Sequence, residues 1–507
     1  NVAGLIAYAT ASSSDKGTME LYWCWNEGDV TGLAVVGGLI AATTSSTTTK
    51  NPLILTECYN TGTITAYATA TQGASSSPTA GLAAFYNIGS QFIDCYNEGT
   101  INSTNQYTAG IAAYPRAKAS VDSPTLFSGC YNVGEIVSTN HHAAGIVGNI
   151  SDYVTVQGCY NKADVEGRYG LGGIVGTITA APNGKIKDSW NSGNITTSLN
   201  RAGGIFGYTV NGAPVENCFN VGDVKTTCEE VGTSATVSGY AIGGIAGQGG
   251  APFVNCYNMG TVTGANRVGG LVGAPYKNRT TIVNSYNAGN IVCGDDECGA
   301  LIGVDLSDGT LWAEDNKVEG SYFVTDYGTY PNSTVGTAVT VAELAKLEEL
   351  GEGWTMGDAY TLPMLSNSAS VSEALINAVT VGFADGDSKD LVTQNFFVGA
   401  PEGVVWSASV PNITFSGTDA VFSSEAFEGK AVLTAAAGEL TREFEINCNK
   451  TVSGIDEIGG KVVVNEVWFN AIGVQVPEPV YRDGAVYMVI RTYDDGTVET
   501  VKVFNAD

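Results

Sequence analysis

Short apolar segments recur through the first two thirds of the chain at a nearly constant interval, and none has the spacing of an amphipathic helix. Cys or Ser, an aromatic residue and Asn form a motif that is usually followed by Gly and then by Ile or Val. Its nine copies begin 29 to 38 residues apart, at Cys24, Cys58, Cys95, Cys130, Cys159, Ser189, Cys218, Cys256 and Ser285. Repeats this regular indicate one structural unit that is stacked many times.

A second motif lies between these copies and surrounds one large apolar residue with small ones, as in Gly203-Gly204-Ile205-Phe206-Gly207. Each repeat therefore holds about three short strands, separated by Gly, Asn and Ser clusters. Such strands bury their apolar faces only by stacking on neighbouring repeats. The pattern predicts an all-β fold, a right-handed parallel β-helix with about ten rungs. A β-propeller blade needs about 40–45 residues, which the shortest spacings do not provide.

Two interior columns follow from this fold. The large apolar residue of the second motif is expected to form one column, which comprises Leu39, Leu82, Ile111, Ile146, Ile174, Ile205, Ile245, Leu271 and Leu301. Seven of the eleven cysteines share the first position of the aromatic motif, and Ser takes that position twice. Because Ser forms no disulfide, we expect stacked, buried, free thiols there. The off-phase Cys293 and Cys298 are placed to close a local loop, and no Cys or His spacing indicates a zinc site.

The aromatic residue of the motif poses the main question about function, because its orientation decides whether it belongs to the core or to the surface. Counting strand alternation back from the Ile or Val after the motif places the ring outside. Counting forward from the apolar residue before it, such as Phe92, places the ring inside. The counts conflict, so we expect a turn or bulge nearby, and we favour the interior orientation. Outward rings would form a platform for sugars or a partner protein, and the candidate binding residues are then Tyr96, Tyr131, Tyr160, Trp190, Tyr257 and Tyr286.

Residues 1 to about 365 resemble the GLUG-motif repeats of bacterial surface and adhesin-like proteins, which also lie beside the protease domain of some IgA-cleaving metalloproteases. The resemblance rests on the ten successive copies of the two motifs, the tenth being the decayed Ser321-Tyr322-Phe323. It implies a β-helical scaffold of an adhesin-like protein. The chain begins inside a repeat, and we expect that its N-terminus has been cut and that either a cap or further rungs precede it.

The rest of the chain divides into three predicted parts. A cap over about 331–370 closes the domain 1–370, since Thr340 and Glu343 form a capping box before an apolar stripe at Leu344, Leu347 and Leu350. Residues 371–448 change to alternating strands, and Trp406-Ser407-Ala408-Ser409 with 429–435 resembles a bacterial Ig-like β-sandwich. Residues 449–507 resemble the C-terminal β-domain that serves as a type IX secretion sorting signal. The resemblance rests on Asn470-x-x-Gly473, Tyr487-x-Val489 and Lys502-Val503.

Charge and histidine content narrow the possible functions. The chain has 51 acidic and 23 basic residues and a formal net charge of −28, so it lacks the basic surface of a nucleic-acid-binding protein. No apolar run is long enough to span a membrane. We interpret the only two histidines, His141 and His142, as a solvated or half-buried pair, and we predict no catalytic centre, metal or cofactor. Three acidic groups are interpreted as surface turns and not as calcium sites: Asp295 to Glu297, Asp305 with Asp308, and Asp385 with Asp387.

These features predict a non-enzymatic protein, secreted or displayed on the outer cell surface, that binds a host or matrix glycan or protein as a monomer. Two alternatives stay open. Parallel β-helices also support polysaccharide lyases and glycoside hydrolases, and the carboxylate pair of a hydrolase is recognised only by its separation in space. The lyase alternative needs clustered basic residues, which this chain spreads thinly. The second alternative is a passive spacer that lifts another domain away from the cell.

Overall fold

The computed structural model describes residues 1–9, 17–43, 51–67, 77–116, 120–231, 238–276, 279–294, 297–303, 316–328, 330, 335–346, 350–451, 463–470, 475–476, 486–493 and 496–504. The chain is nearly all β, with 53% strand and 3% helix. It forms two compact units. The first contains Asn1–Gly382, Phe397–Ser407 and Thr434–Phe444, and the second contains Phe383–Phe396, Ala408–Leu433 and Glu445–Asp507.

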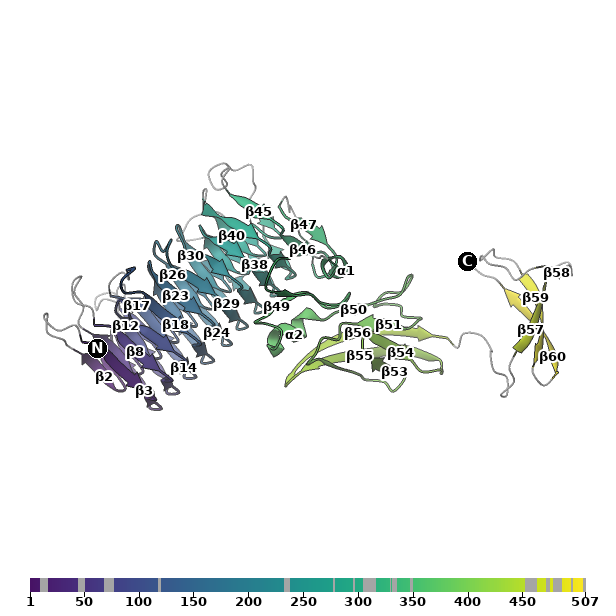
Figure 1. The fold of residues 1–507 in the computed structure, drawn as a ribbon, viewed down its shortest axis with the longest axis horizontal. Helices are drawn as coiled ribbons and strands as arrows, with labels where there is room; N and C mark the ends of the chain where they lie inside the picture. The colour runs from purple at the N-terminus through teal and green to yellow at the C-terminus, as the bar shows by residue number, and fades with distance from the viewer. Residues whose placement is uncertain are drawn as a thin grey trace. The chain divides into compact units, whose positions relative to one another are not determined.

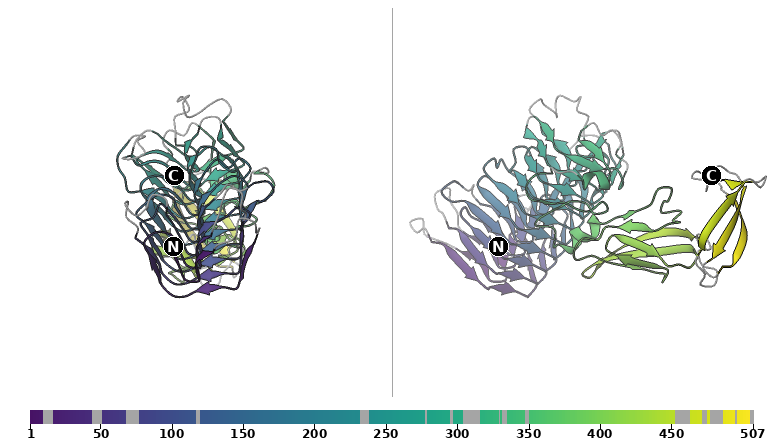
Figure 2. Two further views of the ribbon diagram at one scale, coloured as in Figure 1. Left: turned by 90° about the vertical axis from the view of Figure 1, so that its left-hand side faces the viewer. Right: turned by 45° about the vertical axis from the view of Figure 1, so that its right-hand side comes forward.

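Residues 1–339 form a parallel β-helix, as the repeats predict, in which strands of successive coils stack in register (Figures 1 and 2). Sheet B contains β2 (Ile6–Ala9), β7 (Ile40–Thr43), β12 (Ala83–Tyr86), β17 (Ala112–Pro115), β22 (Val147–Ile150), β26 (Val175–Ile178), β30 (Phe206–Thr209), β35 (Ala246–Gly249) and β40 (Val272–Pro275). Sheet C contains β3 (Met19–Tyr22), β8 (Leu53–Thr56), β13 (Gln91–Ile93), β18 (Thr125–Ser128), β23 (Val154–Gln157), β27 (Lys185–Lys187), β31 (Val215–Glu216), β36 (Pro252–Val254), β41 (Thr281–Val283) and β45 (Lys317–Glu319).

Sheet D carries the aromatic motif, and sheet A takes two strands or one long strand from each of its coils. Sheet D contains β4 (Trp25–Asn26), β9 (Tyr59–Asn60), β14 (Tyr96–Asn97), β19 (Tyr131–Asn132), β24 (Tyr160–Asn161), β28 (Trp190–Asn191), β32 (Phe219–Asn220), β37 (Tyr257–Asn258), β42 (Tyr286–Asn287), β46 (Tyr322–Val324) and β47 (Thr337–Val339). Sheet A contains β1 (Val2–Ala3), β5 (Val30–Gly32), β6 (Val36–Gly37), β10 (Ile64–Ala66), β11 (Pro78–Ala80), β15 (Ile101–Ser103), β16 (Tyr107–Ala109), β20 (Ile136–Ser138), β21 (Ala143–Ala144), β25 (Val165–Gly172), β29 (Ile195–Gly203), β33 (Val224–Thr226), β34 (Tyr240–Gly243), β38 (Val262–Gly264), β39 (Asn266–Gly269), β43 (Ile291–Cys293) and β44 (Cys298–Gly299).

The interior of the β-helix confirms both predicted columns. All nine apolar residues of the second motif are fully buried in one core cluster. Cys58, Cys95, Cys130, Cys159, Cys218 and Cys256 are buried in the same cluster as free thiols, and Cys24 of the first coil packs against it. The thiols bond locally, since Sγ of Cys95 donates to the carbonyl oxygens of Ile93 at 3.3 Å and Leu55 at 3.4 Å. The off-phase Cys293 and Cys298 form a disulfide, as their spacing predicts.

An asparagine ladder runs through sheet D beside the thiols. Nδ2 of Asn97 donates to Oδ1 of Asn132 in the next coil at 2.8 Å and to the Gly99 carbonyl of its own coil at 2.8 Å. The same pair of bonds recurs from Asn26 to Asn258. Glycine in the second motif makes room for this ladder, because a Cβ on Gly173 would lie 2.3 Å from Oδ1 of Asn191. Satisfied side-chain amides fix each coil on the next.

A left-handed residue directly before each motif explains why the two alternation counts conflict. Asp94, Gly129 and Asn255 have φ values of 50°, 65° and 52°, and each precedes the motif cysteine of its coil. This conformation breaks the alternation between sheets C and D, so each count is valid only on its own side of the break. The Cys and Asn side chains face inward, and the aromatic ring between them faces outward. The interior orientation that we favoured for the rings is therefore wrong.

The segments after the β-helix are short. Helix α1 (Val341–Leu344) has the predicted capping box, with Glu343 N donating to Thr340 Oγ1 at 3.2 Å and Thr340 N donating to Glu343 Oε2 at 2.8 Å. It ends before Leu347, which lies outside the described residues. The next elements are β48 (Trp354–Thr355), β49 (Met364–Leu365) and α2 (Ser372–Ala378).

Residues 381–450 form two small sheets. The first has the order β50 (Val381–Gly382), β51 (Phe396–Val398), β54 (Asp419–Phe422) and β53 (Ile413–Ser416), and the second has β52 (Val405–Ala408), β55 (Phe427–Ala437) and β56 (Leu440–Lys450). The last sheet is antiparallel, with the order β58 (Gln475–Val476), β57 (Val463–Phe469), β59 (Val486–Tyr493) and β60 (Val498–Phe504).

Candidate functional site

The outward aromatic residues of sheet D stack ring on ring into one column of nine, which we call the ladder. Neighbouring ring centres lie 4.7 to 5.8 Å apart, and neighbouring planes differ by no more than 7°. Ladder residues are Trp25, Tyr59, Tyr96, Tyr131, Tyr160, Trp190, Phe219, Tyr257 and Tyr286. The two-residue strands of sheet D put one ring on each coil in the same register, so the column is a direct consequence of the repeat.

Exposure falls steadily along the ladder. The side chain of Trp25 is 50% exposed, Trp190 is 8% exposed, and Tyr257 and Tyr286 are fully buried. The rings between Trp25 and Trp190 are half-buried. We call the column from Trp25 to Tyr160 the open ladder and the column from Trp190 to Tyr286 the covered ladder.

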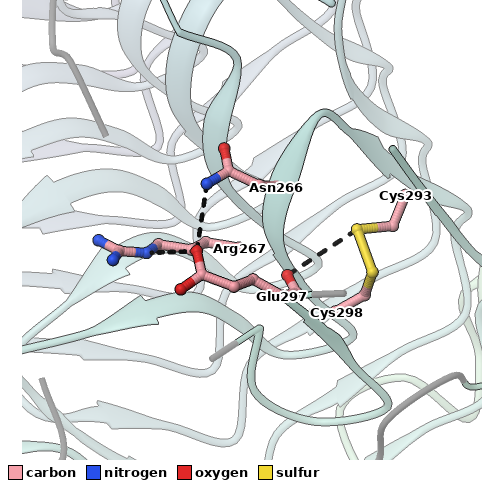
Figure 3. The surroundings of a disulfide bond; sticks show 5 residues. All are labelled: Asn266, Arg267, Cys293, Glu297 and Cys298. Carbon is pink, nitrogen blue, oxygen red and sulfur yellow. Dashed lines mark hydrogen bonds and ion pairs between the residues drawn. A yellow bond between two sulfur atoms is a disulfide. The ribbon is translucent and has the colours of Figure 1, made fainter. Parts of the chain in front are cut away.

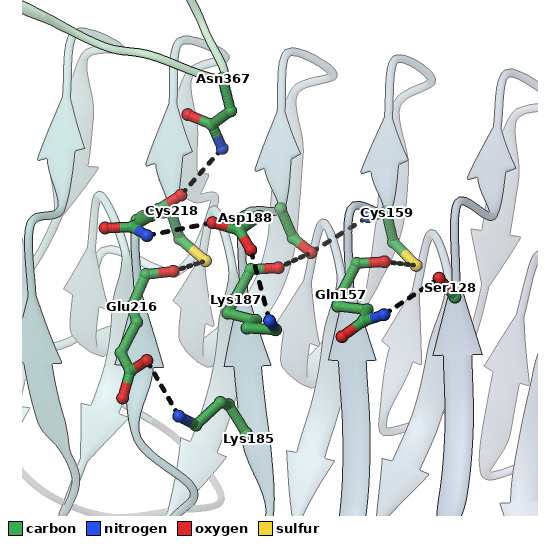
Figure 4. A network of polar contacts seen from close by, with 11 residues as sticks. Ser128, Gln157, Cys159, Lys185, Lys187, Asp188, Glu216, Cys218 and Asn367 are labelled. Carbon is green, nitrogen blue, oxygen red and sulfur yellow. Dashed lines mark hydrogen bonds and ion pairs between the residues drawn. The ribbon is translucent and has the colours of Figure 1, made fainter. Parts of the chain in front are cut away.

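The covered ladder is buried by later segments of the same unit. Trp354 of β48 lies 5.8 Å from the ring centre of Tyr257 and 5.5 Å from that of Tyr286, tilted by 46° and 42°. The hydroxyl of Tyr286 donates to the Pro363 carbonyl at 2.6 Å. Nδ2 of Asn367 donates to the Asn217 carbonyl at 3.1 Å, so the segment follows sheet D over several coils (Figure 4). The rings belong to a core cluster separate from the helix interior.

A cavity of about 560 Å³ opens where the open ladder meets the covering segments. Its floor is formed by the stacked rings of Tyr160 and Trp190, whose centres lie 4.7 Å apart. The other lining residues include Lys162, the start of α2, Glu439 in the turn between β55 and β56, and Leu440 at the start of β56. The cavity therefore combines a flat aromatic floor with polar groups at its edge.

One ion pair closes a side of this cavity. Nζ of Lys162 lies 2.7 Å from Oε1 of Glu373 on α2 and within 5.9 Å of the ring centres of both Tyr160 and Trp190. Burial, and then the nearby Glu373 carboxylate, raise the pKa of the Tyr160 hydroxyl, which keeps this hydroxyl neutral at physiological pH. A neutral phenol and an ammonium group donate hydrogen bonds, while Glu439 accepts them, so the rim offers both to a polar ligand.

The remaining polar network on the outside of sheets C and D is structural in character. Lys185 Nζ pairs with Glu216 Oε2 at 3.0 Å, and Asn217 Nδ2 donates to Asp188 Oδ1 at 3.0 Å (Figure 4). Asp188 also lies 3.8 Å from Lys187 Nζ. The first two contacts connect neighbouring coils at half-buried positions, and the third joins two consecutive residues of one coil.

The structure brings together some of the predicted site residues and separates others. Tyr96 and Tyr131 lie on the open ladder, and Tyr160 and Trp190 form the cavity floor. Tyr257 and Tyr286 are fully buried beneath the covering segment, so an external ligand does not reach them while that segment is in place. Of the predicted acidic turns, Asp295, Asp296, Asp305 and Asp308 lie outside the described residues. Asp387 accepts bonds from the backbone and hydroxyl of Thr393, both at 2.8 Å.

Sequence reasoning missed Lys162, Glu373 and Glu439, and its candidate binding residues left out the first two rings of the open ladder, Trp25 and Tyr59. A signal for Lys162 existed, because it is the only basic residue directly after the Asn of a motif copy and precedes Ala163, the one replacement of the motif glycine. Glu373 and Glu439 carry no such signal, since the fold alone brings α2 and the β55–β56 turn to this coil. Within the part of the chain that the structure describes, no three His, Cys, Asp or Glu side chains are grouped for a metal ion.

Comparisons with known proteins found no match for this chain. No family model matches the chain, and neither the curated proteins nor the solved structures gave a match. Among the described residues, no helix has both the length and the apolar character needed to cross a membrane.

Proposed function

We propose that this chain is a non-enzymatic recognition protein, secreted or displayed on the outer cell surface, that binds a glycan along the open ladder. The observation that carries the proposal is the column of half-buried, parallel aromatic rings that ends in a polar-rimmed cavity. Because the ring faces stack on one another, the open ladder presents a continuous strip of aromatic edges and Tyr hydroxyls to a ligand. A sugar chain presents apolar ring faces and polar hydroxyl edges, which match both parts of this surface.

The rigidity of the open ladder supports the same function. The rings are held by parallel strands at a spacing of about 4.8 Å and by the asparagine ladder behind them. Binding to a preformed surface costs little ordering of the protein. A linear ligand along the ladder makes a similar shallow contact on each coil, so weak contacts add up to useful affinity.

The covered ladder supports the view that these rings bind other groups. There the chain places an aromatic ring, Trp354, and a backbone carbonyl, that of Pro363, against Tyr257 and Tyr286. The open ladder presents the same ring column without such a cover. A protein segment is therefore the second candidate ligand, and it is favoured by this internal example.

The proposed architecture places this surface on a modular adhesin. We propose that residues 1–370 are a GLUG-type repeat domain with a right-handed β-helix whose last part, about 331–370, acts as a cap. The two small sheets of 371–448 are then an Ig-like sandwich, and the antiparallel sheet in 449–507 is a sorting domain for type IX secretion. Two small sheets in about 80 residues suit an Ig-like sandwich.

A binding screen followed by a turnover assay tests the proposal. The purified chain is applied to an array of neutral and acidic oligosaccharides and host matrix proteins. It is then incubated with the polysaccharides that bind, with and without Ca²⁺, and reducing ends and unsaturated products are measured. We expect binding without turnover, and loss of binding in a variant with Tyr59→Ala, Tyr96→Ala and Tyr131→Ala.

The control and the contrary outcomes are defined by the structure. Tyr67 is 49% exposed but lies outside the ladder, so Tyr67→Ala should bind as the wild type does. Turnover that disappears in Glu373→Gln or Glu439→Gln would replace the proposal with a glycoside hydrolase. Absence of binding to every sugar and protein would favour a passive spacer.

A further inference from the structure

A second group of aromatic and basic side chains lies on sheets A and B, away from the strands of the ladder. The guanidinium carbon of Arg201 (β29) lies 4.6 Å from the ring centre of Tyr208 (β30) and 5.8 Å from that of Tyr169 (β25). The rings of His141 and Tyr169 lie 4.0 Å apart, and Nη1 of Arg168 lies 3.4 Å from Nε2 of His141. We call these five residues the corner cluster.

The backbone of the corner cluster is left-handed at Arg201, a conformation that glycine adopts without strain. Arg201 has φ 58°, and its partner in the preceding coil is Gly170, with φ 70°. His142 adopts the same left-handed conformation, with φ 61°. Left-handed backbone disfavours every residue that has a Cβ, and it persists where the surrounding structure determines it. Ala241 and Arg267 take the same conformation at this position of the next two coils, with φ 59° and 50°, so the repeat itself imposes it and each coil turns its corner side chain in the same way.

The two arginines of the cluster lack acidic partners. Within the described residues, neither Arg168 nor Arg201 forms an ion pair, whereas Lys162 and Lys185 on neighbouring coils each do. Arg201 donates instead to neutral groups, to Oε1 of Gln248 at 2.8 Å and to the hydroxyl of Tyr240 at 2.5 Å. Both guanidinium groups therefore carry a positive charge that no acidic side chain among the described residues neutralises through an ion pair.

The histidines do not supply charge to this cluster. Burial, and then Arg168, lower the pKa of His141 to about 4, and burial with the charges of neighbouring groups lowers that of His142 to about 3. Both rings are neutral at pH 7, so they do not repel the guanidinium groups. His142 stacks on Tyr107 at 5.0 Å and extends the aromatic surface toward β16.

The chain itself shows what an arginine at this corner binds. Arg267 occupies the equivalent corner two coils further along, with φ 50°. Its Nε donates to Oε2 of Glu297 at 3.0 Å, and Glu297 is held beside Cys298 of the disulfide (Figure 3). At the one corner where another side chain of the described residues pairs with the arginine, that side chain is the carboxylate of Glu297.

We propose that the corner cluster is a binding site for a sugar that carries a carboxylate. Nε and Nη2 in the guanidinium fork of Arg201 donate to Gln248 and Tyr240, and Nη1 is the donor left for the carboxylate. Arg168 adds a second charge, and Tyr169 and Tyr208 pack against the sugar ring. The net charge of −28 repels a polyanion, so the preferred ligand is an otherwise neutral glycan with an isolated acidic residue. This site is independent of the ladder.

Isothermal titration with oligosaccharides that end in glucuronic acid or a sialic acid tests the proposal, with the carboxyl-reduced forms of the same sugars as comparison. We expect the wild type to bind at least one acid and to bind its reduced form at least tenfold more weakly. Arg201→Gly removes the fork while relaxing the backbone, so its loss of binding is not explained by unfolding. Circular dichroism checks that the variant is folded. Arg168→Gln should weaken binding in the same direction.

Matched variants separate this site from the others. Arg267→Gln, at the corner that Glu297 already fills, and Tyr96→Ala on the ladder should leave the affinity for the acidic sugar unchanged. Equal affinity for the acid and its reduced form, unchanged binding by Arg201→Gly, or no binding of either acid at millimolar concentration would overturn the proposal. Tighter binding of a peptide with a free C-terminal carboxylate than of any acidic sugar would overturn the assignment of a sugar.

Discussion

Lys162 and Glu373 form an ion pair, with Nζ and Oε1 2.7 Å apart, that joins the coil after β24 to helix α2. The two residues are separated by more than two hundred positions in the chain, and their pairing fixes the edge of the cavity above Tyr160 and Trp190. The side chain of Lys162 is 41% exposed and that of Glu373 only 16%. The pair is thus better shielded than a fully exposed surface ion pair.

A double-mutant cycle measures this pair. Lys162→Ala, Glu373→Gln and the double variant should give a coupling free energy of about 0.5–1 kcal/mol in urea unfolding, at the upper end for partly exposed pairs. The control is the pair Lys185–Glu216, whose acid is 34% exposed and which lies away from the cavity; its coupling should be smaller. A coupling of zero at Lys162 and Glu373 would contradict the proposed link between α2 and the coil.

The interior column makes a stability prediction. Ile205→Asp should lower the free energy of unfolding by about 4 kcal/mol or more, because an unpaired charge is buried among apolar side chains on every side. Ser198→Asp, at an exposed position of the same coil, should change stability by less than about 0.5 kcal/mol. Equal effects of the two variants would mean that Ile205 does not lie in the interior.

The repeat was enough to predict the columns at Ile205 and Cys95, because every coil must bury the same two positions. It was not enough to orient the rings. The left-handed residue before each motif, such as Asp94, breaks the alternation, and no local pattern marks that break when the residue is not glycine. The sequence did not predict the cavity either. Glu373 and Glu439 lie beside Tyr160 only because of the course that the chain takes after the last coil.

Thiol reactivity tests the buried cysteines. Burial raises the pKa of Cys256 to about 12 and also raises the pKa of Cys95 and Cys130, so the reactive thiolate is scarce as well as inaccessible. Iodoacetamide labelling followed by mass spectrometry should be at least about 100-fold slower at these residues in the folded chain than in urea. Cys24 of the first coil, which is only half-buried, should react faster. Rapid labelling of Cys130 would remove the interior column of thiols.

The two histidines allow a direct test of the corner of sheet A. The lowered pKa values of about 4 for His141 and about 3 for His142 predict two NMR signals that do not titrate between pH 5 and 8 and that move to ordinary values near 6.5 in urea.

A pKa that is lower in the folded than in the unfolded state stabilises the fold above pH 6.5, and that stability is lost as the pH falls. For the buried His142 the loss is about 2 kcal/mol by pH 5. Titration of either signal near pH 6.5 in the folded chain would contradict this account.

The most direct measurement of the central claim is the ratio of dissociation constants for the tightest neutral glycan, determined by isothermal titration with the wild type and with the variant carrying Tyr96→Ala and Tyr131→Ala. These two rings stack at 4.8 Å in the middle of the open ladder, so their removal interrupts the platform and leaves the interior columns intact. We predict at least a tenfold increase in the dissociation constant and no change in the Tyr67→Ala control. An unchanged dissociation constant in the ladder variant would show that the rings are not the binding surface.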